Sequence, residues 1–295
     1  MKDSFSTFHP IINFGYFGAV ILFSMFFMHP VFLVISFLCS IIYSTVLNRM
    51  KAFKFNILYM IPTLILIALI NPAFNHEGGT ILLYINDNPL TLESIIYGAA
   101  SAMMFITVII WFSCYNSIMS SDKFIYLFGR IIPALSLIFS MALRFVPKLK
   151  AQIKVISNGQ KAIGRDVSRG NIIQKIKNGM RIISILTTWA LENAIETADS
   201  MKARGYGLKG RTSFSLYRFD NRDKVIFSIM MALIAIVFVG STLGENNIRY
   251  FPTIKAKPFS WLSILVYFSY GALCIMPVLL DILEGIKWKR ITSQI

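Results

Sequence analysis

The stretch Met201–Gly210 reads Met-Lys-Ala-Arg-Gly-Tyr-Gly-Leu-Lys-Gly and closes a long helical segment. Arg204 stands directly before Gly205, and glycine is the residue that most often lets a chain turn away at a helix C-terminus. An arginine there presents its guanidinium at a defined place, where it can pair with a carboxylate of another protein. The stretch therefore predicts a protein contact rather than covalent chemistry. The alternative is a basic residue that only favours the helix dipole, an effect of about 0.3–1 kcal/mol.

The composition around this stretch is typical of a membrane protein. Of the 295 residues, 56% are hydrophobic and 15% are charged, whereas an ordinary soluble domain has about 25% charged residues. Several apolar runs approach the roughly 20 residues that a helix needs to cross a bilayer. The net charge of +15 fits basic cytoplasmic loops and anionic lipid, so no nucleic acid partner is expected. We predict an all-α, polytopic membrane protein.

About six membrane spans are expected, and the charges between them set their direction. Residues 48–55 carry three basic and no acidic side chains, which places them in the cytoplasm. Residues 71–91 contain no Lys or Arg and are expected outside. Both termini are predicted to be cytoplasmic. The apolar runs cover residues 12–28, 31–47, 56–71, 92–119, 225–243 and 259–280.

The fourth run contains a series of small residues, Gly98-Ala99-Ala100-Ser101-Ala102. Small residues let helices approach closely in lipid. Two interpretations stay open, which are packing inside this chain and a docking face for a separate membrane subunit.

A basic region separates the fourth and fifth spans. From Lys148 to Lys224 there are 16 Lys or Arg and six Asp or Glu residues, a net charge of +10. Such a region is expected in the cytoplasm, with residues 120–147 lying along or partly in the membrane. The predicted domains are an N-terminal transmembrane bundle (1–119), a membrane-edge and cytoplasmic helical region (120–223) and C-terminal transmembrane helices (224–295).

Two long helices are predicted in the basic region, from about Pro133 to Ile163 and from about Asn171 to Ala203. Their apolar residues recur at helical spacing, which favours a hairpin that buries one face of each helix against the other. Breaks are expected at Gly164, Gly170 and Gly205. The apolar stripe predicted on the second helix consists of Ile172, Ile173, Ile176, Met180, Ile183, Leu186 and Leu191.

Three motifs in the region resemble a known family. They are Phe145-Val146-Pro147, then Asn-Gly-Gln-Lys-Ala-Ile-Gly-Arg-Asp at 158–166, and Ala-Asp-Ser-Met-Lys-Ala-Arg-Gly-Tyr-Gly at 198–207. They are similar to the transmembrane T component of energy-coupling factor (ECF) transporters, the EcfT/CbiQ-like family. That group also includes the membrane component of cobalt and nickel uptake systems. The resemblance follows the layout from about residue 10 to 245 and is most specific from Arg144 to Gly207.

The resemblance implies a non-catalytic scaffold with two long cytoplasmic coupling helices. Each helix would end in a motif, Ala203-Arg204-Gly205 or Ala162-Ile163-Gly164, that inserts into a groove of a cytoplasmic ABC-type ATPase subunit. A small membrane subunit, the S subunit, would bind a vitamin or a metal ion for uptake through the plasma membrane of a prokaryote. No cofactor and no metal are expected in this chain, because the partner ATPases would bind ATP and magnesium.

The first motif departs from the family pattern, which is usually Ala-Arg-Gly. This chain has Ile163 in place of the arginine, with Lys161 two positions before it and Arg165 two positions after. Two residues turn a helix by about 200°. Three interpretations stay open: Arg165 replaces the arginine after the helix ends, Ile163 makes an apolar contact in an altered groove, or this coupling is weaker. Two different ATPase subunits are therefore expected.

Two other functions compete with the transport scaffold. A membrane-embedded enzyme would need ionisable residues clustered beside the spans, and only Asp281 and Glu284 stand out there. A stand-alone secondary transporter would need ionisable residues within the spans and paired broken helices, and Asn13 and His29 are too few. The sequence contains no Gly-x-x-x-x-Gly-Lys-Ser/Thr motif for ATP, which agrees with hydrolysis by partner subunits.

Overall fold

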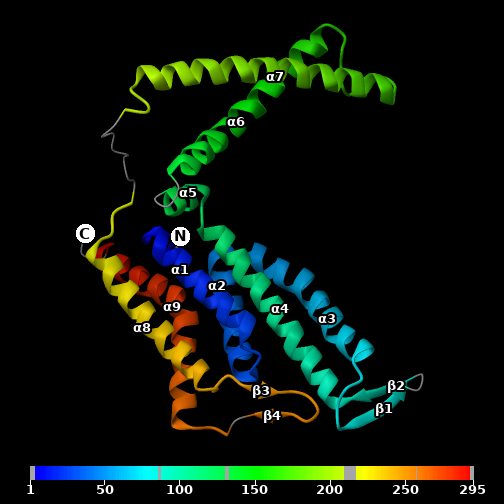
Figure 1. The fold of residues 1–295 in the computed structure, drawn as a ribbon, viewed down its shortest axis with the longest axis vertical. Coiled ribbons are helices and arrows are strands. Elements are labelled where there is room, and N and C mark those ends of the chain that lie inside the picture. The colour runs from blue at the N-terminus through cyan, green and yellow to red at the C-terminus, as the bar shows by residue number, and fades with distance from the viewer. Residues whose placement is uncertain (1–3, 86–87, 130–132, 209–216, 257, 293–295) are drawn as a thin grey trace. The chain divides into compact units, whose positions relative to one another are not determined.

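The computed structural model describes residues 4–85, 88–129, 133–208, 217–256 and 258–292. These residues are mostly helical, with two short hairpins (Figure 1), so the predicted all-α, polytopic fold is confirmed. The chain divides into two compact units. We call residues 1–123 and 217–295 the membrane unit, and residues 124–216 the helical-pair unit.

The membrane unit contains an apolar helix at each predicted span. Among the described residues, α2, α4, α8 and α9 include stretches long and apolar enough to cross a bilayer, whereas α1 and the apolar stretch Leu58–Phe74 are shorter. A short π-helix, Asn56–Met60, precedes α3. The helices are α1 (Pro10–Phe26), α2 (Pro30–Phe55), α3 (Ile61–Phe74), α4 (Leu92–Ile118), α8 (Asn221–Thr242) and α9 (Trp261–Thr292).

The core of the membrane unit is aromatic and is crossed by a chain of hydrogen bonds. Trp111 of α4 donates from Nε1 to Ser36 Oγ of α2 at 3.0 Å. Ser36 Oγ also pairs with Ser24 Oγ of α1 at 2.7 Å, and Ser24 pairs with the Tyr270 hydroxyl of α9 at 3.1 Å. Buried polar groups need such partners, so this network fixes four helices relative to one another.

Gly98 shows what the small residues of α4 do. A Cβ atom at Gly98 would lie 2.6 Å from the carbonyl oxygen of Ala68 in α3, so only glycine permits this close approach. Ala102 is also buried, whereas Ala99 is exposed. At Gly98 and Ala102, therefore, packing inside the chain is the correct interpretation.

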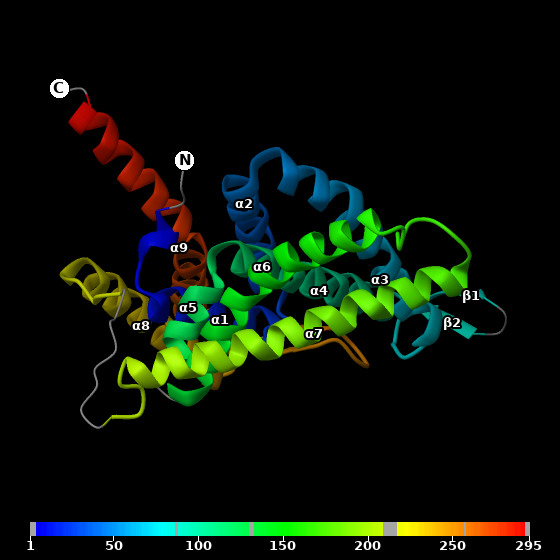
Figure 2. The same ribbon diagram turned by 90° about the horizontal axis from the view of Figure 1, so that it is seen from above.

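Two short antiparallel hairpins were not predicted. One joins β1 (Ile81–Ile85) to β2 (Asn88–Thr91), and the other joins β3 (Ile248–Arg249) to β4 (Lys255–Ala256). The first follows α3 and precedes α4, and it projects sideways from their end in both ribbon views (Figures 1 and 2). Its apolar run, with Gly78-Gly79 before it and polar residues after it, is a strand signal that an all-helical interpretation overlooked.

The helical-pair unit consists mainly of α6 (Pro133–Ala162) and α7 (Ile172–Ala203), reached through α5 (Ser121–Gly129). Both long helices are confirmed to within one residue of their predicted ends. Ile156 of α6 and Ile182 of α7 are the buried apolar residues among those described in the unit. Residues 130–132 lie outside the described residues, and the course of residues 120–147 relative to the membrane stays a prediction.

The predicted apolar stripe of α7 is not buried against α6, so this part of the prediction was wrong. The exposed members are Ile172, Ile173, Ile176, Met180, Ile183 and Leu191, and only Leu186 is partly buried. The contact with α6 involves Trp189 and Asn193 instead. Helical periodicity identifies an apolar face but not the element that covers it. One face of α7 is therefore apolar and exposed.

Candidate functional site

The C-terminal end of α7 has the geometry of a Schellman motif. Gly205 has a φ of 76°, a left-handed conformation that glycine adopts without strain. Its N–H donates to the carbonyl of Lys202 at 2.9 Å, and the N–H of Tyr206 donates to the carbonyl of Met201 at 3.0 Å. These are the two hydrogen bonds of the motif. Arg204 is the C-cap residue of α7 and is exposed.

The C-terminal end of α6 repeats this geometry. Gly164 has a φ of 80°. Its N–H donates to the carbonyl of Lys161 at 3.0 Å, and the N–H of Arg165 donates to the carbonyl of Gln160 at 2.9 Å. Ala162-Ile163-Gly164 therefore matches Ala203-Arg204-Gly205 residue for residue in its backbone. Ile163, with 62% of its surface exposed, stands where α7 has Arg204.

The two basic neighbours of Ile163 occupy other backbone positions. Arg165 follows the left-handed Gly164 and corresponds to Tyr206 of the α7 end. Lys161 lies in the last turn of α6, and its Nζ is 3.8 Å from Oδ2 of Asp166. Neither Lys161 nor Arg165 therefore occupies the backbone position at which the family usually has its arginine.

Hydrogen bonds fix the loop between α6 and α7. The N–H of Ser168 donates to Oδ1 of Asp166 at 2.9 Å, and Asn178 of α7 donates to the carbonyl of Asp166 at 3.1 Å. The hydrogen bond from Ser168 holds the pKa of Asp166 below its ordinary value. Asn171 then caps α7 in a capping box with Gln174. The end of α6 is thus attached to a loop of defined course.

Trp189 joins the two long helices and was not found from the sequence. Its ring stacks on Phe145 with centroids 5.9 Å apart. Lys148 Nζ lies 5.5 Å from the centre of the Trp189 ring and donates to Asn193 Oδ1 at 2.5 Å. Phe145, which belongs to the first of the three motifs, therefore acts as a packing residue between α6 and α7.

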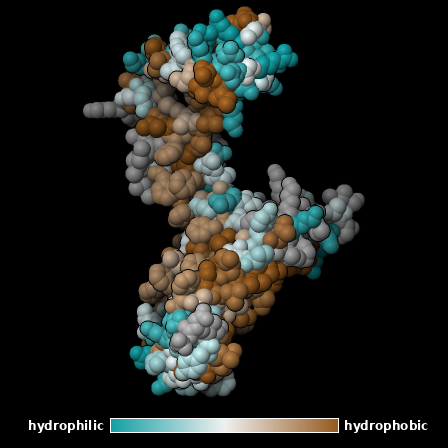
Figure 3. Space-filling view, turned by 90° about the vertical axis from the view of Figure 1, so that its right-hand side faces the viewer, coloured by the Kyte–Doolittle hydropathy of each residue, from teal (hydrophilic) through white to brown (hydrophobic). Residues whose placement is uncertain are grey.

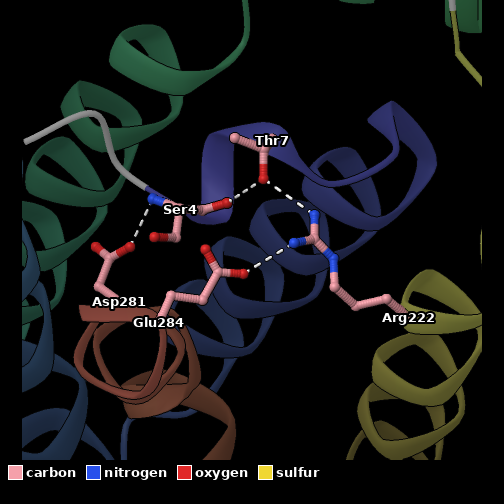
Figure 4. Close-up of polar contacts among 5 residues, drawn as sticks. All are labelled: Ser4, Thr7, Arg222, Asp281 and Glu284. Atoms are coloured by element: carbon pink, nitrogen blue, oxygen red, sulfur yellow. Dashed lines mark hydrogen bonds and ion pairs between the residues drawn. The ribbon is translucent and has the colours of Figure 1, made fainter. Parts of the chain in front are cut away.

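Within the membrane unit, the start of α8 is tied to the N-terminal segment (Figure 4). Arg222 Nη1 pairs with Glu284 Oε1 of α9 at 2.9 Å, and its Nη2 donates to Thr7 Oγ1 at 3.1 Å. The same guanidinium lies 4.2 Å from the centre of the Phe8 ring. The chain returns to the membrane unit at residue 217, so this cluster lies shortly after the point of return.

The point of departure is tied to the same N-terminal segment. Lys123, the last residue of the membrane unit before the helical-pair unit, is buried. Its Nζ donates to the carbonyl oxygens of Ser6 at 2.6 Å and Ile118 at 3.2 Å. The N–H of Ser4 donates to Oδ1 of Asp281 at 2.6 Å. One short segment therefore contacts Lys123 and Arg222, which lie before and after the helical-pair unit in the chain.

The two acids near the end of α9 have structural partners. Oδ1 of Asp281 accepts a hydrogen bond from the N–H of Ser4, and Oε1 of Glu284 pairs with Nη1 of Arg222. Within the described ranges, no group of three or more His, Cys, Asp or Glu side chains is placed to hold a metal ion.

Fold and site together define a polytopic α-helical membrane protein with a helical pair whose two helices end in matching glycine turns. The family described as "CbiQ: Cobalt transport protein" matches residues 8–216, and the chain belongs to this family. The resemblance predicted from the motifs is thereby confirmed.

Curated relatives are named "Energy-coupling factor transporter transmembrane protein EcfT". The protein of Lactococcus lactis is 36% identical over 107 residues, which are 35% of this chain and 40% of that protein. The protein of Streptococcus thermophilus is 38% identical over 110 residues, or 36% of this chain and 42% of that protein. EcfT 1 of Listeria monocytogenes is 29% identical over 185 residues, which are 58% of this chain and 69% of that protein. The chain thus spans about two fifths of the length of the first two relatives.

Proposed function

We propose that this chain is the energy-coupling transmembrane subunit of an ECF-type ABC importer. It links two cytoplasmic ABC-type ATPase subunits to a small substrate-binding S subunit. Membership of the CbiQ family and similarity to proteins named EcfT support this function. The observation that carries it is the pair of matching helix ends, each of which presents an exposed residue, Arg204 or Ile163, at the same backbone position.

Arg204 is the stronger of the two contacts in this proposal. Its planar guanidinium makes two parallel hydrogen bonds to a carboxylate in an ATPase groove. Gly205 turns the chain away directly afterwards, and Ala203 keeps the last turn narrow. Because α7 is a continuous helix of 32 residues, a push at this end moves the whole helix as a rigid body.

The end of α6 makes a different contact. Ile163 enters an apolar groove, since Arg165 does not share the backbone position of Arg204. The two ATPase subunits therefore differ, and each binds its own helix end. ATP and magnesium are bound by these partners, while this chain transmits the movement.

The exposed apolar face of α7 supports a protein partner as well. Its members include Ile172, Ile173 and Ile176, each more than half exposed, and exposed apolar patches of this kind mark interaction sites. We assign this face to the S subunit, which carries the vitamin or metal ion. The assembly lies in the plasma membrane of a prokaryote with both termini of this chain in the cytoplasm.

Co-purification tests the proposal. The tagged chain, extracted from membranes, is expected to retain two ATPases and one small hydrophobic protein. Arg204→Glu should abolish retention of at least one ATPase because it places a carboxylate against the groove. Arg169→Glu is the matched control, since Arg169 is exposed in the α6–α7 loop and carries the same charge change outside both glycine turns.

Two outcomes contradict the proposal. One is a chain that purifies alone and transports a solute unaided, which would make it a secondary transporter. The other is equal ATPase retention by Arg204→Glu and the unchanged protein. Circular dichroism of both variants establishes that the helices are intact.

A further inference from the structure

The β1–β2 hairpin carries apolar side chains on both faces. The register shifts between Ile81 and Leu83, which interrupts the alternation of side chains there. Successive residues of a strand otherwise point to opposite sides, so Leu83 lies on one face of the hairpin and Tyr84 on the other. The apolar side chains of the strand are Ile81, Leu83, Leu82 and Tyr84. All four are exposed, by 49%, 64%, 51% and 67% respectively. The stretch from Gly78 to Ile85 contains no charged residue. An isolated hairpin with this composition is unfavourable in water.

The base of the hairpin is rigid, so its direction is fixed. Glu93 is buried at the start of α4 and accepts a hydrogen bond from Thr80 Oγ1 at 2.6 Å. The N–H of Leu92 donates to the carbonyl of Thr80 at 3.0 Å. Thr91 Oγ1 donates to the carbonyl of Glu77 at 2.8 Å. The polar groups at the base are thus used internally, and the apolar residues lie beyond them toward the turn.

A second attachment joins this base to the loop between α8 and α9. The N–H of Gly79 donates to the carbonyl of Pro252 at 2.9 Å. A Cβ atom at Gly78 would lie 2.7 Å from both Glu93 and Thr91, so the base is also closely packed. A mobile surface loop would have neither feature, and the exposure of the hairpin is therefore a stable property of the fold.

We infer that the β1–β2 hairpin lies in the lipid–water interface and that lipid covers its apolar side chains. Lipid surrounds an element on all sides, whereas a docked protein covers one face, and here both faces are apolar. The hairpin also continues the exposed apolar surface of the neighbouring helices, which includes Ile70, Phe74, Ile95 and Ile96. Hydrophobic residues cover much of the membrane unit on the side toward which the hairpin projects (Figure 3). The inference needs only the membrane location of this chain and not the proposed transport function.

The unpaired backbone groups of the hairpin determine how deep it lies in the membrane. The sheet has two strands, so each strand has one edge whose N–H and C=O groups are not paired within the sheet. Such groups are not tolerated in the hydrocarbon core, and the hairpin therefore lies at the headgroup–acyl boundary, where burial is about 5–10 Å. Tyr84 suits this level because its ring is apolar and its hydroxyl is polar. The projection is sideways from the helix ends in both ribbon views (Figures 1 and 2), as an interfacial element requires.

The apolar stretch before the hairpin agrees with this depth. Leu58–Phe74 is shorter than the spans of α2, α4, α8 and α9 and contains 17 residues, fewer than the roughly 20 that cross a bilayer. A short span ends below the membrane surface or thins the bilayer locally. Asn75, His76 and Glu77 follow it directly and are polar, so the chain reaches the headgroup level there, and apolar residues return from Ile81 onward.

Fluorescence quenching tests the inference on the full chain. A single cysteine replaces Leu83 in a protein whose buried Cys39, Cys114 and Cys274 have been changed to alanine, and it is labelled with an environment-sensitive dye. The protein is placed in vesicles of phosphatidylethanolamine and phosphatidylglycerol. Glu77→Cys is the control, since Glu77 is exposed beside the base.

The dye at residue 83 should be quenched at least three-fold more strongly by nitroxides near the glycerol level of the lipid than by aqueous iodide. The dye at residue 77 should show the reverse order. Equal iodide quenching at residues 83 and 77 would place the hairpin in water and overturn the inference. Shielding of residue 83 from both quenchers, in vesicles or after co-purification with partner proteins, would show that protein covers it and would overturn the inference as well.

Discussion

The ends of α6 and α7 have the same backbone and different side chains. Both turn at a left-handed glycine, with φ values of 80° at Gly164 and 76° at Gly205, and both make the same two hydrogen bonds. The residue before each glycine is Ile163 in one helix and Arg204 in the other. The glycine thus sets where the helix ends, and the residue before it sets what the end can bind. Binding chemistry can therefore change at one end without disturbing the fold.

Exchanging the two side chains gives the largest expected effect. Arg204→Ile should reduce retention of one ATPase about 30-fold or more, because loss of a buried charged partner costs about 2–5 kcal/mol. Ile163→Arg should cause a smaller loss of the other ATPase, since it brings an unpaired charge to an apolar groove. Binding of each purified ATPase to the detergent-solubilised variants measures both effects.

A gain of ATPase retention in Ile163→Arg would contradict the proposed difference between the two helix ends. If Ile163→Arg strengthens ATPase retention, the groove at the α6 end carries an acidic partner and the two ends are chemically equivalent. Ile163→Val, which keeps an apolar side chain, is the matched control and should bind like the unchanged protein.

Replacing either glycine should have a smaller effect, which is a loss of stability in the last turn of the helix. A side chain in the left-handed conformation costs about 1–2 kcal/mol, so Gly164→Ala and Gly205→Ala should each fray the last helical turn. The effect should be larger at Gly205, where a Cβ atom would lie 3.0 Å from Cδ1 of Leu208, whereas nothing lies within 4 Å at Gly164. Amide hydrogen exchange of the last turns measures the difference, and faster exchange in Gly164→Ala would contradict this packing argument.

The stack between Phe145 and Trp189 joins the two long helices at a place away from their C-terminal ends. Trp189→Ala removes the aromatic pair and the contact with Lys148, together about 1 kcal/mol. We expect a broader distribution of distances between spin labels on α6 and α7, with helicity unchanged. Trp189→Phe keeps the stack and should retain the narrow distribution. An equally narrow distribution in Trp189→Ala would show that other contacts hold the pair.

The smallest effect should come from Asp166, which supports the α6 end through its loop. Its pKa lies below the ordinary value of 3.8 because the N–H of Ser168 donates to it. The stabilisation is therefore complete above pH 3.8 and is lost as the pH falls through the lowered pKa. Exchange of the Ser168 amide, corrected for its intrinsic rate, should increase several-fold on this acidification. Asp166→Asn should remove the pH dependence, and persistence of the dependence in that variant would assign it to another group.

The parts of the structure that the sequence predicts well depend on local signals. The bounds of α6 and α7 follow from periodic apolar residues that end at Gly164 and Gly205, and both glycines are left-handed in the structure. The coupling motif at Arg204 is recognisable for the same reason, because its residues are consecutive. Its role as a coupling contact stays a proposal.

The parts that were missed depend on contacts between distant residues. Which face of α7 meets α6 is decided by Trp189, whose partner Phe145 lies on another helix. Lys123 and Ser6 are 117 residues apart in the sequence, and Arg222 and Thr7 are 215 residues apart, so no local sequence pattern predicts either contact. The β1–β2 hairpin is different, since its strand signal was local and was hidden by the strongly helical composition around it.

The contacts of the N-terminal segment bear on the order in which the parts of the protein assemble. Ser4 and Thr7 are synthesised well before their partners Asp281 and Arg222, which follow them by 277 and 215 residues respectively. The helical-pair unit, whose contacts fall within residues 124–216, is complete before those partners exist. The contacts of Ser4 with α9 and of Thr7 with α8 therefore form after the helical-pair unit has been synthesised, whereas the residues of the Ser6–Lys123 contact are present earlier.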